Sequence, residues 1–273
     1  MIVRLIAPST ETSEHYGLIG LKPISGFIGC EITGVDLSEV SMPVMAEIKD
    51  ALSERLVLIF RNQNKLTRDG HINFARNFGD VLHLPHFPSL QNHPEIGLVH
   101  REASDKTSFF GEAFHCDSTF LRKPPTVIVM RGVELPPFGG DTAFSNLYVA
   151  YESLSERMRE LIDGLKVVRS DGRIRSDPEA YEKIGSDEGY REAIHPLAVA
   201  HPVTGRKCLF LNPKLSVRFD GMTEEESAPL LNFLLQHLQF LPFTTRVRWE
   251  ADTIVMWDNW AASHCKRGLE AAV

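Results

Sequence analysis

A histidine and an aspartate stand two residues apart in the stretch GEAFHCDSTF, residues 111–120. If this stretch is a strand, the side chains of His115 and Asp117 point to the same side, because strand residues alternate. With a third ligand from elsewhere, they would form the 2-His-1-carboxylate arrangement that holds non-haem Fe(II) and leaves coordination positions open. The pair alone is a weak indication, since a buried histidine bonded to a nearby carboxylate has the same spacing.

The third ligand must come from a distant segment, and the candidate is His264 in the stretch WDNWAASHCKRG. This histidine follows an apolar strand pattern, DTIVMW, at residues 252–257. The other histidines lie in Pro-rich segments or helical patterns, and we interpret them as structural or solvent-exposed. A zinc hydrolase could use the same three ligands, but no separate general base stands out in the sequence.

Short strands would position these residues. Strand patterns, which are short runs of apolar and β-branched residues, dominate the second part of the sequence. They cover residues 96–100, 126–135, 141–146, 207–212, 246–250 and 252–259. Helical spacing of apolar residues interrupts them at residues 150–165 and 224–241. Antiparallel strands with helices at the edges indicate an α+β protein built on a β-sandwich or jelly roll.

The first part of the sequence contains stronger helical patterns. A helix is predicted over residues 42–56, with Ser41 as its cap, and a buried strand over residues 57–60. A second helix is predicted over residues 67–80, ending at Gly79 as a C-cap. These elements would flank the strands that carry the candidate ligands.

Composition and charge exclude several classes of protein. The chain has 273 residues, 43% of them hydrophobic, which predicts a single domain over residues 1–273. The formal net charge of −7 disfavours a nucleic-acid partner, and no apolar run approaches the roughly 20 residues of a membrane span. The start of the chain is a poor signal peptide, and the four scattered cysteines indicate reduced thiols. We therefore expect a cytoplasmic protein without a membrane partner.

Over nearly its whole length, the chain resembles the taurine dioxygenase and phenoxyacetate-herbicide dioxygenase (TauD/TfdA) family of Fe(II)- and 2-oxoglutarate-dependent enzymes. The similar stretches include GFIGCEITGVDL, VLIFRNQ, FARNFGD, FHCDSTF and VRWEADTIVMWDN, in the family's order and at its usual spacing. The resemblance implies a double-stranded β-helix (jelly roll, cupin-like) with flanking helices. It implies His115, Asp117 and His264 as iron ligands, and Thr142 as the residue that hydrogen-bonds the far carboxylate of 2-oxoglutarate.

The same resemblance implies a function. The expected enzyme uses Fe(II) as cofactor and 2-oxoglutarate as co-substrate, hydroxylates a small organic substrate, and releases succinate and CO2. Its partners would be that substrate, 2-oxoglutarate and O2, and a homo-oligomer is compatible with the family.

The C-terminal segment departs from the family pattern. The family has an arginine about ten to fifteen residues beyond the distal histidine, where it pairs with the far carboxylate of 2-oxoglutarate. Here nine residues follow His264, and Arg267 is three residues on. We expect a truncated C-terminus without the final core strand, or a divergent one that recruits Arg267 or another basic residue. The alternative function is a catalytically impaired or inactive relative that binds metal or ligand but lacks this arginine.

The expected substrate-binding residues also differ from those of the taurine enzyme. Leu84 and Phe87 fall where that enzyme has a histidine and a tyrosine. Gly111 falls where it has an asparagine, and Ile174 falls near its substrate-side serine. His83 lies beside the changed positions and could restore polarity if the loop shifts. Because a buried anion without donors is costly, we expect a larger, more apolar substrate than taurine.

Overall fold

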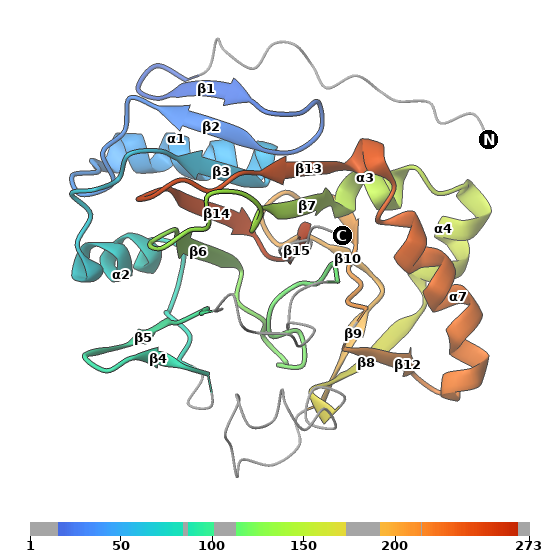
Figure 1. The fold of residues 1–273 in the computed structure, drawn as a ribbon. Coiled ribbons are helices and arrows are strands. Elements are labelled where there is room, and N and C mark those ends of the chain that lie inside the picture. The colour runs from blue at the N-terminus through green and yellow to red at the C-terminus, as the bar shows by residue number, and fades with distance from the viewer. Residues whose placement is uncertain (1–15, 84–86, 101–112, 173–191, 214, 267–273) are drawn as a thin grey trace.

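The computed structural model describes residues 16–83, 87–100, 113–172, 192–213 and 215–266 (Figure 1). The elements of the first half are β1 (Gly20–Pro23), β2 (Cys30–Thr33), α1 (Met42–Arg55), β3 (Val57–Phe60), α2 (Arg68–Arg76), β4 (Ser89–Leu90), β5 (His93–Gly97) and β6 (Val127–Arg131). Those that follow are β7 (Thr142–Asn146), α3 (Leu147–Glu152), α4 (Glu156–Asp163), β8 (Lys166–Ser170), β9 (Glu192–Pro196), β10 (Ala198–Ala200) and β11 (Lys207–Leu209). The last are β12 (Ser216–Phe219), α7 (Glu224–His237), the 3-10 turn η1 (Leu241–Phe243), β13 (Thr244–Val247), β14 (Ile254–Asp258) and β15 (Ala262–Lys266).

The strands form several small sheets that join distant parts of the chain. A five-stranded sheet has the order β1-β2-β3-β14-β6, and two three-stranded sheets have the orders β13-β7-β15 and β12-β8-β9. The pairs inside the five-stranded sheet are antiparallel except β2–β3, which is parallel. The late strand β14 is therefore inserted between two early ones, β3 and β6 (Figure 1). Such crossovers are typical of jelly-roll folds.

The central strand β3 is buried on both faces. Leu58 and Phe60 belong to an apolar cluster between the five-stranded sheet and α1, whereas Val57 and Ile59 belong to the larger core on the other face. Because side chains alternate along a strand, a strand covered on both sides must be apolar throughout. This explains the sequence VLIF, which was predicted as a buried strand with the observed bounds.

The two longest described helices cover different sheets. Helix α1 packs on β3 and β14 and buries Met45, Ile48 and Leu52, whereas α7 packs on β12. In Figure 1, α7 lies with α3 and α4 on the side of the molecule away from α2. No helix within the described ranges is both long and apolar enough to cross a membrane. The four cysteines are buried, and none of them forms a disulfide.

Several predicted boundaries are wrong. Helix α2 ends at Arg76, before Gly79, because the side-chain amide of Asn77 donates to two carbonyls of the last turn. The helix predicted over residues 150–165 is two helices, α3 and α4, because Ser155 accepts a hydrogen bond from the N–H of Met158 and starts a new helix. Strands predicted at residues 96–100 and 246–250 lie further toward the N-terminus, as β5 and β13. Ser41 stands at the start of α1 without a side-chain capping bond.

Candidate metal centre

Two histidines from distant segments are joined through their backbones. The N–H of His115 donates to the carbonyl of His264 at 2.8 Å, and the N–H of His264 donates back at 2.8 Å. This isolated antiparallel bridge places them opposite each other, and β15, which carries His264, is held in turn by β7. His115 was predicted on a strand with Asp117, but Asp117 lies in the turn that follows the bridge. The turn still brings its carboxylate to the same side.

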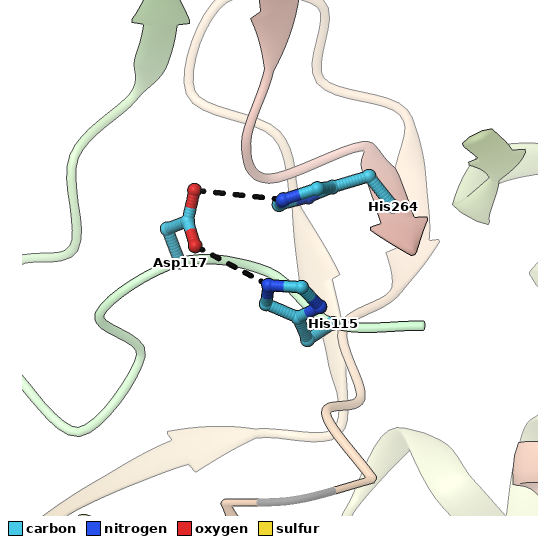
Figure 2. Close-up of side chains that lie close together, drawn as sticks. All are labelled: His115, Asp117 and His264. Atoms are coloured by element: carbon cyan, nitrogen blue, oxygen red, sulfur yellow. Dashed lines mark ion pairs between the residues drawn. The ribbon is translucent and has the colours of Figure 1, made fainter. Parts of the chain in front are cut away.

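The carboxylate of Asp117 faces both imidazole rings (Figure 2). Its Oδ1 lies 3.5 Å from Nε2 of His115, and its Oδ2 lies 3.7 Å from Nε2 of His264. One potential ligand atom from each of the three residues lies within 4.8 Å of the other two. The separations of 3.5 and 3.7 Å exceed ordinary hydrogen-bond lengths, and the three side chains are close enough together to hold one metal ion.

The protonation states in this group suit metal binding. Burial, reinforced by the charge of His115, lowers the pKa of His264 to about 3, so its ring is neutral. Burial acts to raise the pKa of Asp117, but the two imidazoles hold it well below its usual range, so the carboxylate is ionised. The Nδ1–H of His115 donates to the carbonyl of Ala113 at 2.8 Å, which leaves Nε2 facing Asp117. Two imidazoles and one carboxylate are a ligand set that fits Fe(II).

Asn259, between β14 and β15, holds the backbone of Asp117. Its Oδ1 accepts the Asp117 N–H at 2.8 Å, and its Nδ2 donates to the Asp117 carbonyl at 3.0 Å. Nδ2 also donates to the carbonyl of Pro125 at 2.9 Å, and the Asn259 N–H donates to the carbonyl of Thr126 at 2.9 Å. Asn259 is fully buried, so these bonds are shielded from water. One side chain therefore fixes the segment that carries two of the three candidate ligands.

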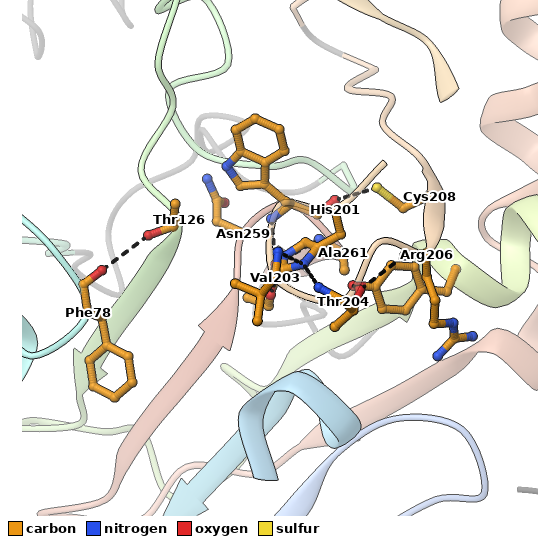
Figure 3. Close-up of polar contacts among 12 residues, drawn as sticks. Phe78, Thr126, His201, Val203, Thr204, Arg206, Cys208, Asn259 and Ala261 are labelled. Atoms are coloured by element: carbon orange, nitrogen blue, oxygen red, sulfur yellow. Dashed lines mark hydrogen bonds and ion pairs between the residues drawn. The ribbon is translucent and has the colours of Figure 1, made fainter. Parts of the chain in front are cut away.

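A buried hydrogen bond between His201 and Asp258 fixes the turn that leads to His264. Nε2 of His201 lies 2.8 Å from Oδ2 of Asp258, while Oδ1 of Asp258 accepts the N–H groups of Trp260 and Ala261. Nδ1 of His201 accepts two N–H groups of its own loop, from Val203 and Thr204 (Figure 3). Since Nδ1 accepts, Nε2 carries the hydrogen and donates it to Asp258. The loop around His201 and the β14–β15 turn are thereby locked together.

Thr142 lies at the start of β7, near the same site. It is buried, and its Oγ1 accepts a hydrogen bond from Nε1 of Trp249 at 3.0 Å. Its register partner on β15 is Lys266, two residues beyond His264. Burial lowers the pKa of Lys266 to about 8, while the charge of Asp117 acts in the opposite direction.

The predicted substrate-binding residues are only partly described. Leu84, Gly111 and Ile174 lie outside the described residues, as does Arg267. His83 is exposed, and Phe87 lies against β5, where an added Cβ on Gly97 would stand 3.0 Å from the Phe87 ring. The predicted loss of the final core strand concerns residues 267–273, which also lie outside the described ranges.

Sequence reasoning missed the residues that support the candidate ligands. Asn259, Asp258 and His201 did not enter the predicted site, and Lys266 was not singled out. The stretch WDN, between a strand and His264, could have drawn attention to the first two, since polar residues in such a turn need buried partners. Nothing local marks His201, because its partner lies in another segment.

Two histidines and one carboxylate at the meeting of antiparallel sheets define the site type of the non-haem iron oxygenases. Comparison with known proteins leads to the same class. Residues 20–272 match the family model described as taurine catabolism dioxygenase TauD, TfdA family. The chain belongs to this family.

Individual relatives agree with this assignment. The chain is 31% identical over 254 residues to an alkylsulfatase of Acinetobacter baylyi, covering 89% of this chain and 78% of that protein. It is 30% identical over 263 residues to an alpha-ketoglutarate-dependent sulfate ester dioxygenase of Pseudomonas putida, covering 93% and 85%. A crystal structure of a putative alpha-ketoglutarate-dependent taurine dioxygenase from Burkholderia xenovorans matches with a TM-score of 0.79 at 33% identity, covering 92% and 86%.

These comparisons decide several of the predictions. The predicted family and enzyme class are confirmed, and the fold is that of the TauD-type dioxygenases, which is a jelly roll. The relatives' dependence on alpha-ketoglutarate agrees with 2-oxoglutarate as the predicted co-substrate, and the His-Asp-His group agrees with the predicted iron. The inactive relative considered as an alternative is not favoured.

Proposed function

We propose that the chain is an Fe(II)- and 2-oxoglutarate-dependent dioxygenase that hydroxylates a small organic molecule. In the overall reaction, substrate, 2-oxoglutarate and O2 give hydroxylated substrate, succinate and CO2. The observation that carries the proposal is the convergence of His115, Asp117 and His264 on one point. Membership of the family supports the same reaction.

In this proposal, the three convergent side chains hold Fe(II), and Thr142 donates a hydrogen bond to the far carboxylate of 2-oxoglutarate. When bound, the iron and 2-oxoglutarate supply the oxidising power for hydroxylation. The chain itself orients the ligands and keeps water away. Phe144 and Trp257 lie beside the ring of His264, with centroids at 6.1 and 4.7 Å, and give it a largely apolar surrounding.

The proposed substrate is larger and more apolar than taurine. The support comes from the sequence, where positions that are polar in the taurine enzyme become Leu84, Phe87, Gly111 and Ile174. Because two relatives are named for alkyl sulfate or sulfate ester chemistry, alkyl sulfates are the first compounds to test. Succinate formation with taurine that equals or exceeds formation with a medium-chain alkyl sulfate would contradict this choice.

The experiment for the reaction class is an anaerobic titration of the full chain with Fe(II) and 2-oxoglutarate. A weak visible metal-to-ligand charge-transfer band should develop, because 2-oxoglutarate would chelate the iron through its 2-oxo acid group. The band should be absent in His115→Ala, which removes one of the three ligands.

The matched control is His93→Ala. His93 also faces a carboxylate, with its Nδ1 3.6 Å from Oδ1 of Asp69, but it lies on β5 outside the candidate centre. This variant should keep the band. If the wild-type chain binds Fe(II) but shows no band at millimolar 2-oxoglutarate, the proposed function is wrong.

We also propose that residues 1–273 form one domain. The larger apolar core contains residues from the early strand β3, from β7 and from the late strand β14, among them Ile59, Phe144 and Trp257. A core shared in this way supports a single folding unit.

A further inference from the structure

The end of β15 brings a lysine close to the candidate metal centre. Lys266 lies two residues after His264, so both side chains project from the same face of the strand. Across the pair with β7, Lys266 stands opposite Thr142 and His264 stands opposite Phe144. Directly opposite residues of an antiparallel pair also share a face. Lys266, Thr142 and His264 therefore gather on one side of these two strands.

Thr142 adds a hydrogen-bond donor at the same place. A hydroxyl has one hydrogen and two acceptor lone pairs. Its Oγ1 uses a lone pair to accept from Trp249, so the hydroxyl hydrogen is left to donate elsewhere. An ammonium and a hydroxyl donor on facing strand positions make a receptor suited to a carboxylate.

We propose that Lys266 and Thr142 together bind the far carboxylate of 2-oxoglutarate, which makes Lys266 a co-substrate-binding residue. The inference rests on the function proposed above, in which the 2-oxo acid end of the co-substrate chelates the iron. Two residues along a strand span roughly 6.6 Å, a length comparable with that of an extended five-carbon dicarboxylate. His264 at one end and Lys266 at the other therefore match its two ends.

The experiment compares two 2-oxo acids by isothermal titration calorimetry on the full chain loaded with Co(II). 2-Oxoglutarate has the far carboxylate, whereas 2-oxovalerate has the same chain length and chelating group without it. Wild type should prefer 2-oxoglutarate. Lys266→Met should weaken 2-oxoglutarate binding about 10- to 100-fold and leave 2-oxovalerate unchanged, because one charge-assisted contact is lost. Lys266→Arg should retain most of the preference.

Two further variants complete the design. Thr142→Val, which removes the hydroxyl at nearly constant shape, should also weaken 2-oxoglutarate selectively, and it tests the receptor even if Lys266→Met fails to fold. Lys22→Met, at an exposed position on β1, is the control and should match wild type. The Co(II) absorption bands of each variant report whether the metal site is intact.

The possible failures are distinguishable. The inference is overturned if Lys266→Met and Thr142→Val weaken the binding of both acids equally, or weaken the binding of neither acid. In either case Lys266 does not bind the far carboxylate. If wild type binds Co(II) but neither 2-oxo acid, the proposed function fails, and the role of Lys266 fails with it.

Discussion

Asn259 fixes the candidate ligand Asp117 through the peptide N–H and carbonyl of Asp117, and not through the carboxylate of Asp117. The side-chain amide bonds both the N–H and the carbonyl of Asp117, which lies 142 residues away in sequence. The carboxylate therefore keeps its charge and lone pairs for a cation, while the backbone is fixed relative to the β14–β15 turn. Partners that orient metal ligands in this way commonly contribute as much as 10- to 100-fold in metal affinity.

Replacing Asn259 by alanine should impair both metal binding and stability. The substitution leaves the N–H of Asp117 and the carbonyl of Pro125 without this partner in a buried environment. We expect Co(II) affinity to fall about 10- to 100-fold and the free energy of unfolding to fall by about 1–3 kcal/mol. Co(II) titration followed by absorption and urea unfolding of the metal-free protein measure the two effects.

The control is Asn77→Ala. Asn77 is exposed, and its amide also bonds backbone carbonyls, at the end of α2. It should leave Co(II) affinity unchanged and cost less stability. Wild-type Co(II) affinity in Asn259→Ala would show that the amide does not position Asp117.

Among the elements, β3 and β14 share the property that both of their faces are covered. One face of each strand packs on the cluster that contains α1, and the other faces the core beside the metal centre. Ile254 and Met256 of β14 belong to the first cluster, Val255 and Trp257 to the second. The strand that leads to Asn259 and His264 is thus held from both sides.

Leu58→Ala tests whether the apolar cluster on the α1 face of β3 affects the stability of the chain without affecting metal binding. Leu58 is fully buried in that cluster, so its truncation should lower the free energy of unfolding by about 2–5 kcal/mol. Co(II) affinity of the folded fraction should stay at the wild-type value, because Leu58 points away from the core beside the metal centre. Urea unfolding and Co(II) titration give the two numbers.

Leu161→Ala is the matched control, since Leu161 is 54% exposed on α4. Its effect should stay within about 0.5 kcal/mol. A loss of Co(II) affinity in folded Leu58→Ala would mean that the two faces of β3 are coupled.

Sequence patterns predicted the bounds of an element best where a single local feature of the sequence determines those bounds. The run VLIF gave β3 with its observed bounds, because four consecutive apolar residues need cover on both faces. The break between α3 and α4 was missed because apolar spacing continues across it, while the capping bond of Ser155 decides the boundary. Likewise, the three candidate ligands follow from residue type and family resemblance. The pair of His201 with Asp258 does not, because only the folded chain brings these residues together.

At the scale of the whole molecule, three histidines outside the metal centre are held neutral by burial. Burial lowers the pKa of His71, His195 and His237. The Nε2 of each lies 2.8–3.2 Å from a backbone carbonyl, so this nitrogen carries the hydrogen. His71 thus contacts β6 through the carbonyl of Val129.

Stability of the metal-free chain should therefore fall in mild acid. An unfolded histidine titrates near pH 6.5, whereas these three bind a proton only at lower pH when folded. Just below pH 6.5 the unfolded chain binds more protons, so the free energy of unfolding decreases as the pH falls. Urea unfolding at pH 7.5 and pH 5.5, with a chelator present, should show lower stability at pH 5.5.

His237→Gln should reduce this difference between the two pH values. Glutamine can still donate to the carbonyl of Ala150 but does not titrate. Equal or greater wild-type stability at pH 5.5 would contradict the prediction.

The backbone bridge between His115 and His264 closes a loop of 264 − 115 = 149 residues. An unfolded chain holds these two rings far apart, so a cation that needs both recognises only the folded molecule. By mass action, free metal above its Kd then draws the population toward the folded state. Metal binding should consequently raise the free energy of unfolding of the chain. A preparation that has lost its iron should lose that part of its stability, even though all three ligands are intact.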